Sequence, residues 1–267
     1  MNYEFDPQLH LKLIVIAGLG GTGSQLARSV TRMVYDMRRR NMFTPEILFV
    51  DPDVVEEKNV GRQMFTAADV GQNKAEVLAR RFNYALGLGI AWRAEPVNGE
   101  LLKTVKDVGL GYHTANEVIL CGAVDNHAAR LELARINATW IDAGNHFSSG
   151  QVVIGNTSDR GNIKRALEEA QRRKQKTLMV SPNAALVFPE LLQPDEQPQP
   201  QVSCADLVAH GDQHLLVNDA VAMVAAQYVY RLLHRQPITT FKTYLSLDSL
   251  AMRSVTISED ELQPYLN

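Results

Sequence analysis

The sequence is poor in cysteine, and its N-terminus has no signal-like pattern. Only two cysteines occur among 267 residues, Cys121 and Cys204, which excludes a disulfide framework and a zinc site built from four cysteines. This scarcity is typical of proteins from a reducing compartment, so we expect a cytoplasmic location and no zinc. The first residues show no basic segment followed by an apolar stretch, and no signal peptide is expected.

Charge and hydropathy exclude two further classes of protein. The net charge is −3, so the chain lacks the basic field on which non-specific nucleic-acid binding depends. No apolar run approaches the roughly 18 residues that a membrane-spanning helix needs. We therefore expect no nucleic-acid partner and no membrane association. The composition is 45% hydrophobic, which suffices for one large domain.

A continuous apolar run followed by a glycine-rich turn stands near the start of the chain. Residues 13–24 read LIVIAGLGGTGS. An unbroken apolar run predicts a parallel strand that is covered on both faces. Glycines after such a strand let the backbone turn tightly, and the N–H groups at the start of the next helix then point at an anion. The stretch therefore predicts a site for a phosphate-bearing ligand.

The rest of the pattern predicts an α/β fold with a mostly parallel central sheet, flanked by helices, and antiparallel strands in the C-terminal half. The expected later strands are 46–50, 92–97, 117–121, 140–144 and 150–155, followed by a closing hairpin of 241–247 and 251–257. The expected helices are 24–40, one ending near 83, 128–137, a charged surface helix at 162–176, and the apolar 214–233.

We expect residues 1–267 to form a single domain. Its nucleotide-binding core would be 11–155, and its C-terminal helix and hairpin would lie in 207–267. Between them, 181–206 is a proline-rich connector that carries Cys204. The five prolines from Pro182 to Pro200 prevent a regular helix there, so a long connector over the surface is expected.

Polar side chains follow the predicted strands. Asp51 ends the second strand, where a Rossmann-like fold binds ribose hydroxyls, although it could instead cap a loop. It stands 28 residues after Gly23, more than the usual offset of about 20. A polar loop with Asn59, Arg62 and Gln63 comes next. Asp125 and Asn126 follow a later strand.

Together these motifs resemble the ThiF/MoeB family, the activating enzymes of ubiquitin-like and sulfur-carrier proteins. The resemblance is carried by GLGGTGS at 18–24, DPDV at 51–54 with Asn59, Arg62 and Gln63, GQNK at 71–74, and DN at 125–126 with Arg130. It covers residues 11–155 and continues more loosely through Cys204 and the last apolar helix. The proline-rich stretch is also similar to ThiF-type members of bacterial PRTRC gene clusters.

The resemblance implies a Rossmann-like adenylation fold that uses ATP and Mg²⁺ to adenylate the C-terminal glycine carboxylate of a partner. The partner would be a ubiquitin-like (β-grasp) protein, with a conjugating enzyme as a further possible partner, and the enzyme would be a homodimer. By the family pattern, the nucleotide is wrapped by Gly18, Gly20, Gly21 and Gly23, and its ribose is bound by Asp51. The phosphates are bound by Arg62 and Lys74 and oriented by Asn59 and Gln63. Asp125 would coordinate Mg²⁺, Asn126 would support the Asp125 loop, and Arg130 would brace that loop through a salt bridge. Cys204 would take the activated carboxylate as a thioester.

Several assignments have plainer alternatives. Arg62 and Lys74 could be ordinary surface residues, and Cys204 could be a packing residue. We expect His127 to be a helix N-terminal residue and Cys121 to be a buried small hydrophobe.

Two other functions are compatible with a glycine turn. An NAD-dependent oxidoreductase would need a proton relay such as Tyr-x-x-x-Lys, which is not evident. A non-catalytic nucleotide-binding scaffold is the other alternative. Residues 1–11 contain no arginine, whereas family members commonly receive one from the partner subunit's N-terminal segment.

Overall fold

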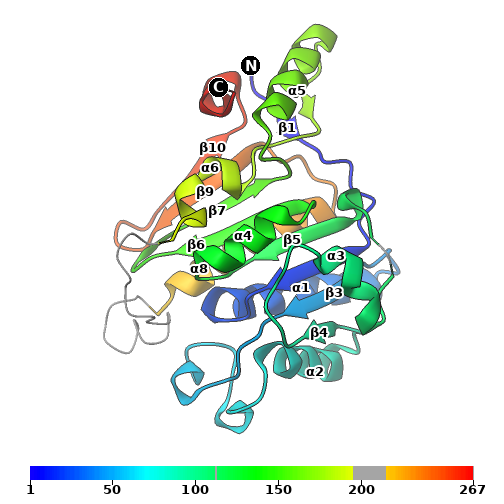
Figure 1. Ribbon diagram of the computed structural model, residues 1–267, viewed down its shortest axis with the longest axis vertical. Helices are drawn as coiled ribbons and strands as arrows, with labels where there is room; N and C mark the ends of the chain where they lie inside the picture. The colour runs from blue at the N-terminus through cyan, green and yellow to red at the C-terminus, as the bar shows by residue number, and fades with distance from the viewer. Residues whose placement is uncertain (112, 195–214, 267) are drawn as a thin grey trace.

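A mixed sheet forms the centre of the protein. The computed structural model describes residues 1–111, 113–194 and 215–266. Within these residues the main sheet has eight strands in the order β10-β9-β7-β6-β5-β2-β3-β4 (Figure 1). They are β2 (Leu13–Ala17), β3 (Glu46–Val50), β4 (Ala91–Arg93), β5 (Val118–Gly122), β6 (Thr139–Asn145), β7 (Ser149–Gly155), β9 (Thr240–Ser246) and β10 (Ala251–Thr256). The five adjacent strands β4, β3, β2, β5 and β6 run parallel to one another. The pairs β6–β7, β7–β9 and β9–β10 are antiparallel.

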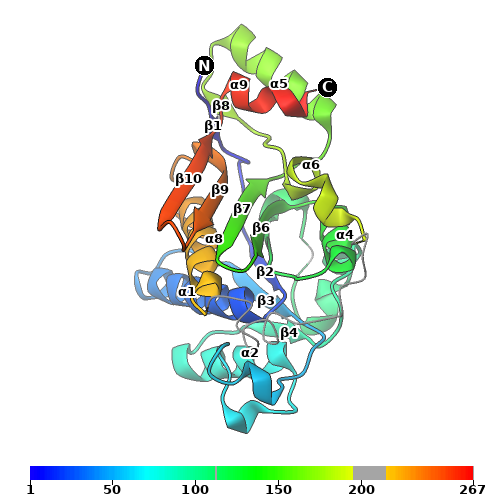
Figure 2. The same cartoon turned by 90° about the vertical axis from the view of Figure 1, so that its left-hand side faces the viewer.

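Helices cover both faces of this sheet (Figure 2). On one face lie α1 (Gly21–Arg39) and α8 (Val217–Leu233), and on the other lie α4 (His127–Arg135) and the short α6 (Ala184–Val187). The strands β2 and β5 are buried at every residue, which explains why their sequences are continuously apolar. Two further helices are α2 (Lys74–Leu86), which contacts α1, and α3 (Leu101–Thr104). Short 3₁₀ turns lie at 57–59, 67–69, 105–108, 115–117 and 189–192.

A smaller layer lies at one end of the sheet, where both termini also lie (Figures 1 and 2). Here β1 (Glu4–Phe5) pairs in parallel with β8 (Thr177–Leu178), beside α5 (Arg160–Arg173), α9 (Glu259–Leu262) and a 3₁₀ turn at 263–265. Of the residues of α5, only Ile163, Leu167 and Ala170 are buried. The predicted charged surface helix is therefore confirmed.

The predicted fold class is confirmed, including the antiparallel β6–β7 pair and the closing hairpin β9–β10. The third strand, β4, spans Ala91–Arg93 rather than 92–97, and Pro96 has no N–H for a sheet hydrogen bond. The helix expected from residue 24 already begins at Gly21, since the N–H of Ser24 bonds the carbonyl of Gly20 at 3.0 Å.

The expected surface connector is wrong for its first residues. Residues 181–184 are buried, and the backbone N–H of Asn183 bonds Thr157 O at 2.9 Å. A Cβ built on Gly155 would lie 2.2 Å from Pro182 O, so this segment packs directly on β7. The carbonyl of Ser181 accepts the N–H groups of Asn156 at 3.0 Å and of Thr157 at 3.2 Å, so the start of the segment is held by the residues that follow β7. The connector from 195 onward, with Cys204, lies outside the described residues, as does residue 214 of the expected last helix.

Candidate nucleotide site

Three adjacent strands end at the same level and bring most of the predicted site residues to one edge of the sheet. β2 lies between β3 and β5, and Ala17 is in register with both Val50 and Gly122. The glycine turn, Asp51 and Asp125 follow these three strands. The loops after β2 and β5 then lead to α1 and α4 on opposite faces, the arrangement in which open α/β folds bind ligands.

Two glycines of the turn, Gly18 and Gly23, leave no room for a side chain. Gly18 has φ +81°, and a Cβ there would lie 2.6 Å from Ala123 O after β5. A Cβ on Gly23 would lie 1.7 Å from Gly18 O. The turn thus places β5 and the start of α1 against each other. The N-cap residue Gly20 makes no side-chain hydrogen bond to the helix, which leaves the N-terminus of α1 suited to an anion.

Asp51 is buried and holds the glycine turn in place. One carboxylate oxygen accepts the N–H of Leu19, and the other accepts the N–H of Asp53 at 2.8 Å. Burial raises the pKa of Asp51, while the positive charge of Lys74 opposes that shift. Asp51 therefore caps the loop that follows β3, as the alternative interpretation of this residue expected. Its place at the end of β3 is also the place expected for a ribose ligand.

Lys74 is a buried cation at the first residue of α2. Its side chain is 8% exposed, and its Nζ lies 2.9 Å from Asp53 Oδ2. The positive end of the helix dipole disfavours a cation at this position, typically by 0.3–1 kcal/mol. The sequence did not reveal Asp53 as its partner. The buried position excludes the view of Lys74 as an ordinary surface residue.

The loop after β3 lies beside the glycine turn. Gln63 Nε2 would be 4.0 Å from a Cβ on Gly20, and the N–H of Met64 lies 3.4 Å from Ser24 Oγ. The Oε1 atom of Gln63 is buried without a protein partner among the described residues. Arg81 on α2 anchors the loop by bonding Met64 O. Its role was not apparent from the sequence.

Two more predicted residues belong to the same loop. Asn59 is 2% exposed, and its Oδ1 accepts the N–H of Glu56 at 2.8 Å, so part of its side chain stabilises the loop itself. Arg62 is half-buried.

Asp125 lies exposed at the end of β5, just before α4. Asn126 is the N-cap of α4, and its Oδ1 accepts the N–H of Ala129 at 2.8 Å. Its Nδ2 donates to Asp125 Oδ1 at 3.2 Å. Asn126 therefore supports this loop, as the family pattern implies. His127 is the first residue of α4, which agrees with the interpretation of this residue as a helix N-terminal one.

Arg130 makes the salt bridge that was expected of it, with a partner that the sequence did not reveal. Its Nε lies 3.5 Å from Asp142 Oδ1, and the two side chains are 10% and 1% exposed. At this distance the contact is an ion pair rather than a well-formed hydrogen bond. It joins α4 to β6 beneath the Asp125 loop. Burial raises the pKa of Asp142, and the nearby charge of Arg130 opposes the shift.

Replacing Arg130 with methionine should destabilise the protein by about 3–5 kcal/mol at neutral pH, because it leaves a buried carboxylate unpaired. Because the pKa of Asp142 is raised in the folded state, this residue stabilises the protein at low pH, and that stabilisation is lost as pH rises through the folded pKa. Without Arg130 this loss is larger. The deficit should therefore be larger at pH 8 than at pH 5. Urea unfolding at both values measures it, and a double variant with Asp142→Asn should recover part of the loss. An equal deficit at both pH values would contradict the assigned pairing.

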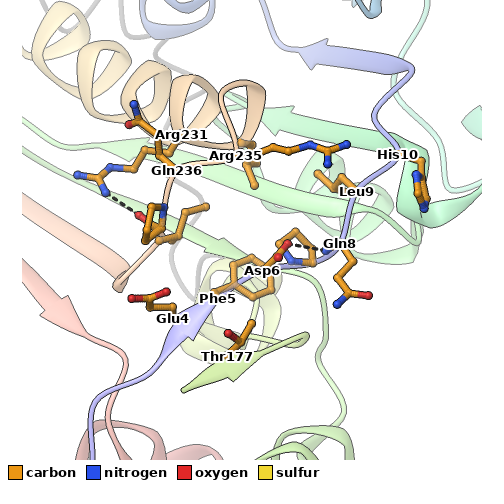
Figure 3. A pocket seen from close by; sticks show the side chains of 14 residues that line it. Glu4, Phe5, Asp6, Gln8, Leu9, His10, Thr177, Arg231, Arg235 and Gln236 are labelled. Atoms are coloured by element: carbon orange, nitrogen blue, oxygen red, sulfur yellow. Dashed lines mark hydrogen bonds between the residues drawn. The ribbon is translucent and has the colours of Figure 1, made fainter. Parts of the chain in front are cut away.

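A second hollow lies at the opposite end of the sheet and does not have these features. It has a volume of about 430 Å³ and lies between the N-terminal segment and the end of α8 (Figure 3). Arg231 and Arg235 line it together with Glu4 and Asp6. Its mixed charges and its place beside the residues that precede β2 set it apart from the glycine turn.

The donors at the strand ends fit ATP. The uncapped start of α1 offers free N–H groups and the buried Lys74 offers a positive charge, and both suit a phosphate-bearing ligand. For a divalent ion the described residues offer no cluster of three or more His, Cys, Asp or Glu. Mg²⁺ usually takes only one or two carboxylates together with phosphate oxygens, so Asp125 alone is compatible with it.

Of the two cysteines, Cys121 lies within the described residues and is buried. Cys121 is fully buried in β5, and desolvation raises the pKa of its thiol to about 12. It is therefore the inert small hydrophobe that was expected. Cys204 lies outside the described residues.

In the part of the chain that is described, no helix is long and apolar enough to cross a membrane.

The fold and the strand-end site define a nucleotide-binding α/β protein, and comparisons with known proteins give its family. The sequence model of the ThiF family matches residues 4–264, so the chain belongs to the ThiF family. A comparison with curated proteins gives no match.

Solved structures confirm the fold. E. coli MccB with ATP is 17% identical with a TM-score of 0.55, covering 95% of this chain and 65% of that one. E. coli MccB with MccA-N7isoASN is 15% identical with a TM-score of 0.55, and the shares are 95% and 66%. PaaA is 15% identical with a TM-score of 0.53, and the shares are 94% and 74%. This chain thus spans about two thirds of the length of MccB.

Proposed function

We propose that the protein adenylates the C-terminal carboxylate of a partner protein with ATP. The carboxylate oxygen attacks the α-phosphate, a P–O bond to that phosphorus forms, and pyrophosphate leaves. Negative charge is redistributed over the phosphates, so such a site needs cations and N–H donors rather than a general base. The glycine turn and the start of α1 supply N–H groups, and Lys74 with Arg62 supplies positive charge.

The buried Lys74 is the observation that carries this proposal. A lysine that is 8% exposed at the positive end of a helix costs stability, and Asp53, at 64% exposure, compensates it only partly. A phosphate group at the neighbouring glycine turn would give this charge a purpose.

Asp125 would hold Mg²⁺ on the phosphates, with Asn126 fixing the carboxylate and Arg130 bracing α4. Asp51 would bind the ribose, and Asn59 and Gln63 would orient the phosphates. We propose a ubiquitin-like partner that ends in glycine. MccB has been crystallised with MccA as well as with ATP, which supports a peptide or protein as the second substrate. A homodimer in the cytoplasm, with or without a conjugating enzyme, completes the proposal.

Exchange of pyrophosphate into ATP tests this function. We expect exchange only when a β-grasp protein with a free C-terminal glycine is present, and none when that glycine is amidated. Exchange that is independent of the partner would contradict a carboxylate acceptor. Binding of ATP without exchange would favour the scaffold alternative.

We further propose that Cys204 takes the activated carboxylate as a thioester, with expulsion of AMP. Cys204→Ala should keep pyrophosphate exchange and lose the adduct that dithiothreitol cleaves, as seen on a non-reducing gel. Cys121→Ala is the matched control, because its thiol is buried and has a pKa of about 12, and it should keep the adduct. An adduct that persists in Cys204→Ala would exclude Cys204 as the nucleophile.

A further inference from the structure

Three polar side chains from distant parts of the chain form a cluster against the glycine turn. They are Thr22 in the first turn of α1, Asn145 at the end of β6 and Asn218 in the first turn of α8. Thr22 Oγ1 donates to Asn218 Oδ1 at 2.9 Å. Asn145 Nδ2 lies 2.5 Å from the same oxygen and 3.0 Å from Thr22 Oγ1. We call these three residues the Asn218 clamp.

The clamp is packed against the glycine backbone. A Cβ on Gly21 would lie 2.6 Å from both Cγ and Nδ2 of Asn218, so the carboxamide rests directly on the Cα of Gly21. Thr22 and Asn218 are 6% and 7% exposed. A buried carboxamide in a mostly apolar helix is costly unless its polar atoms are bonded, and here its oxygen receives two donors. Gly21 is therefore required by Asn218, whatever it contributes to the nucleotide.

The clamp also anchors the first turn of α1, which has no capping side chain. Helices are usually fixed at their start by an N-cap side chain that accepts the first free N–H groups. Gly20 provides no such hydrogen bond. A capping side chain would compete with a phosphate for those N–H groups. The clamp instead holds the turn through the hydroxyl of Thr22, which leaves the N–H groups to the ligand.

We propose that the Asn218 clamp positions the first turn of α1 for the phosphates of ATP. Asn218 and Asn145 are then positioning residues that act through Thr22 and Gly21. This inference rests on the proposed function, because it assumes that a nucleotide binds at the glycine turn. It adds α8 and β6, whose residues lie 196 and 123 positions from Thr22, to the elements that determine nucleotide affinity.

ATP affinity of threonine variants tests the clamp. Thr22→Val removes the hydroxyl at nearly constant shape and should weaken ATP binding about tenfold, the effect of one well-placed hydrogen bond. Thr22→Ser keeps the hydroxyl and should bind ATP within about twofold of the unmodified chain. Thr243→Val is the matched control, because it removes an equally buried threonine hydroxyl away from the glycine turn. Thr243 lies on β9, is 3% exposed, and its hydroxyl lies 2.9 Å from those of both Tyr228 and Ser254. It should lower the unfolding temperature comparably and leave ATP affinity unchanged.

Asn145→Ala provides a second variant at a half-buried position, and it decides the question if Thr22→Val does not fold. It should weaken ATP binding at least about threefold. Calorimetric titration with ATP and MgCl₂ measures all four variants. Unchanged affinity in folded Thr22→Val or Asn145→Ala, or an equal loss in Thr243→Val, would overturn the clamp alone. No ATP binding by the unmodified chain would overturn the proposed function together with it.

Discussion

Lys74→Met is expected to lower the rate of adenylation by about 10²–10³-fold, with a smaller effect on stability. The rate falls because a buried positive charge beside the phosphates is lost. Stability falls because the buried Asp51 carboxylate loses the charge that opposes its raised pKa, but the loss is reduced because a cation leaves the positive end of α2 and the exposed Asp53 remains solvated. Partner-dependent pyrophosphate exchange measures the first effect, and thermal unfolding measures the second.

Lys103→Met is the matched control for this substitution. Lys103 Nζ lies 2.5 Å from Glu100, and its side chain is 76% exposed, so the same change removes an ordinary surface pair. The control should keep both exchange and stability. If folded Lys74→Met exchanged pyrophosphate at the parental rate, Lys74 would be a structural residue and not a phosphate ligand.

Asp125→Ala is expected to reduce exchange by about 10³-fold or more, because the proposed Mg²⁺ loses its only protein carboxylate. The side chain is exposed and bonds only Asn126 among the described residues, so the free energy of unfolding should change by less than about 0.5 kcal/mol. Added MgCl₂ should not restore the rate.

Asp36→Ala serves as the control, since it removes an exposed aspartate that lies 2.9 Å from Arg40. It should exchange normally. Full exchange by Asp125→Ala would show the Mg²⁺ assignment to be wrong, whereas a loss of stability would assign Asp125 to the structure of its loop.

Much of the fold and of the strand-end site could be predicted from local sequence. The apolar runs before the glycine turn, before Asp51 and before Asp125 each mark a buried strand, and parallel strands end at one edge of the sheet. The long offset to Asp51 follows from the 19 residues of α1. Element ends were less predictable, because Gly20 and Gly21 look like a turn although the helix already begins there.

Long-range pairs could not be predicted. Asp142 sits in an apolar strand with no local sign of Arg130, and Asn218 reads as one polar residue in an apolar helix. Each depends on a contact made only after the sheet and helices pack, over 196 residues in the case of Thr22 and Asn218. The one signal in the sequence that could have pointed to Asn218 is a polar residue in an otherwise apolar helix, because a buried polar group needs a partner.

Calorimetric titration of the unmodified chain and Lys74→Met with ATP and with NAD⁺, in the presence of MgCl₂, tests the central claim most directly. The site described here predicts that ATP binds the unmodified chain, that NAD⁺ gives no binding heat, and that Lys74→Met weakens ATP binding by at least about tenfold. Binding of NAD⁺ in preference to ATP, or ATP binding that is unaffected by the loss of Lys74, would contradict it.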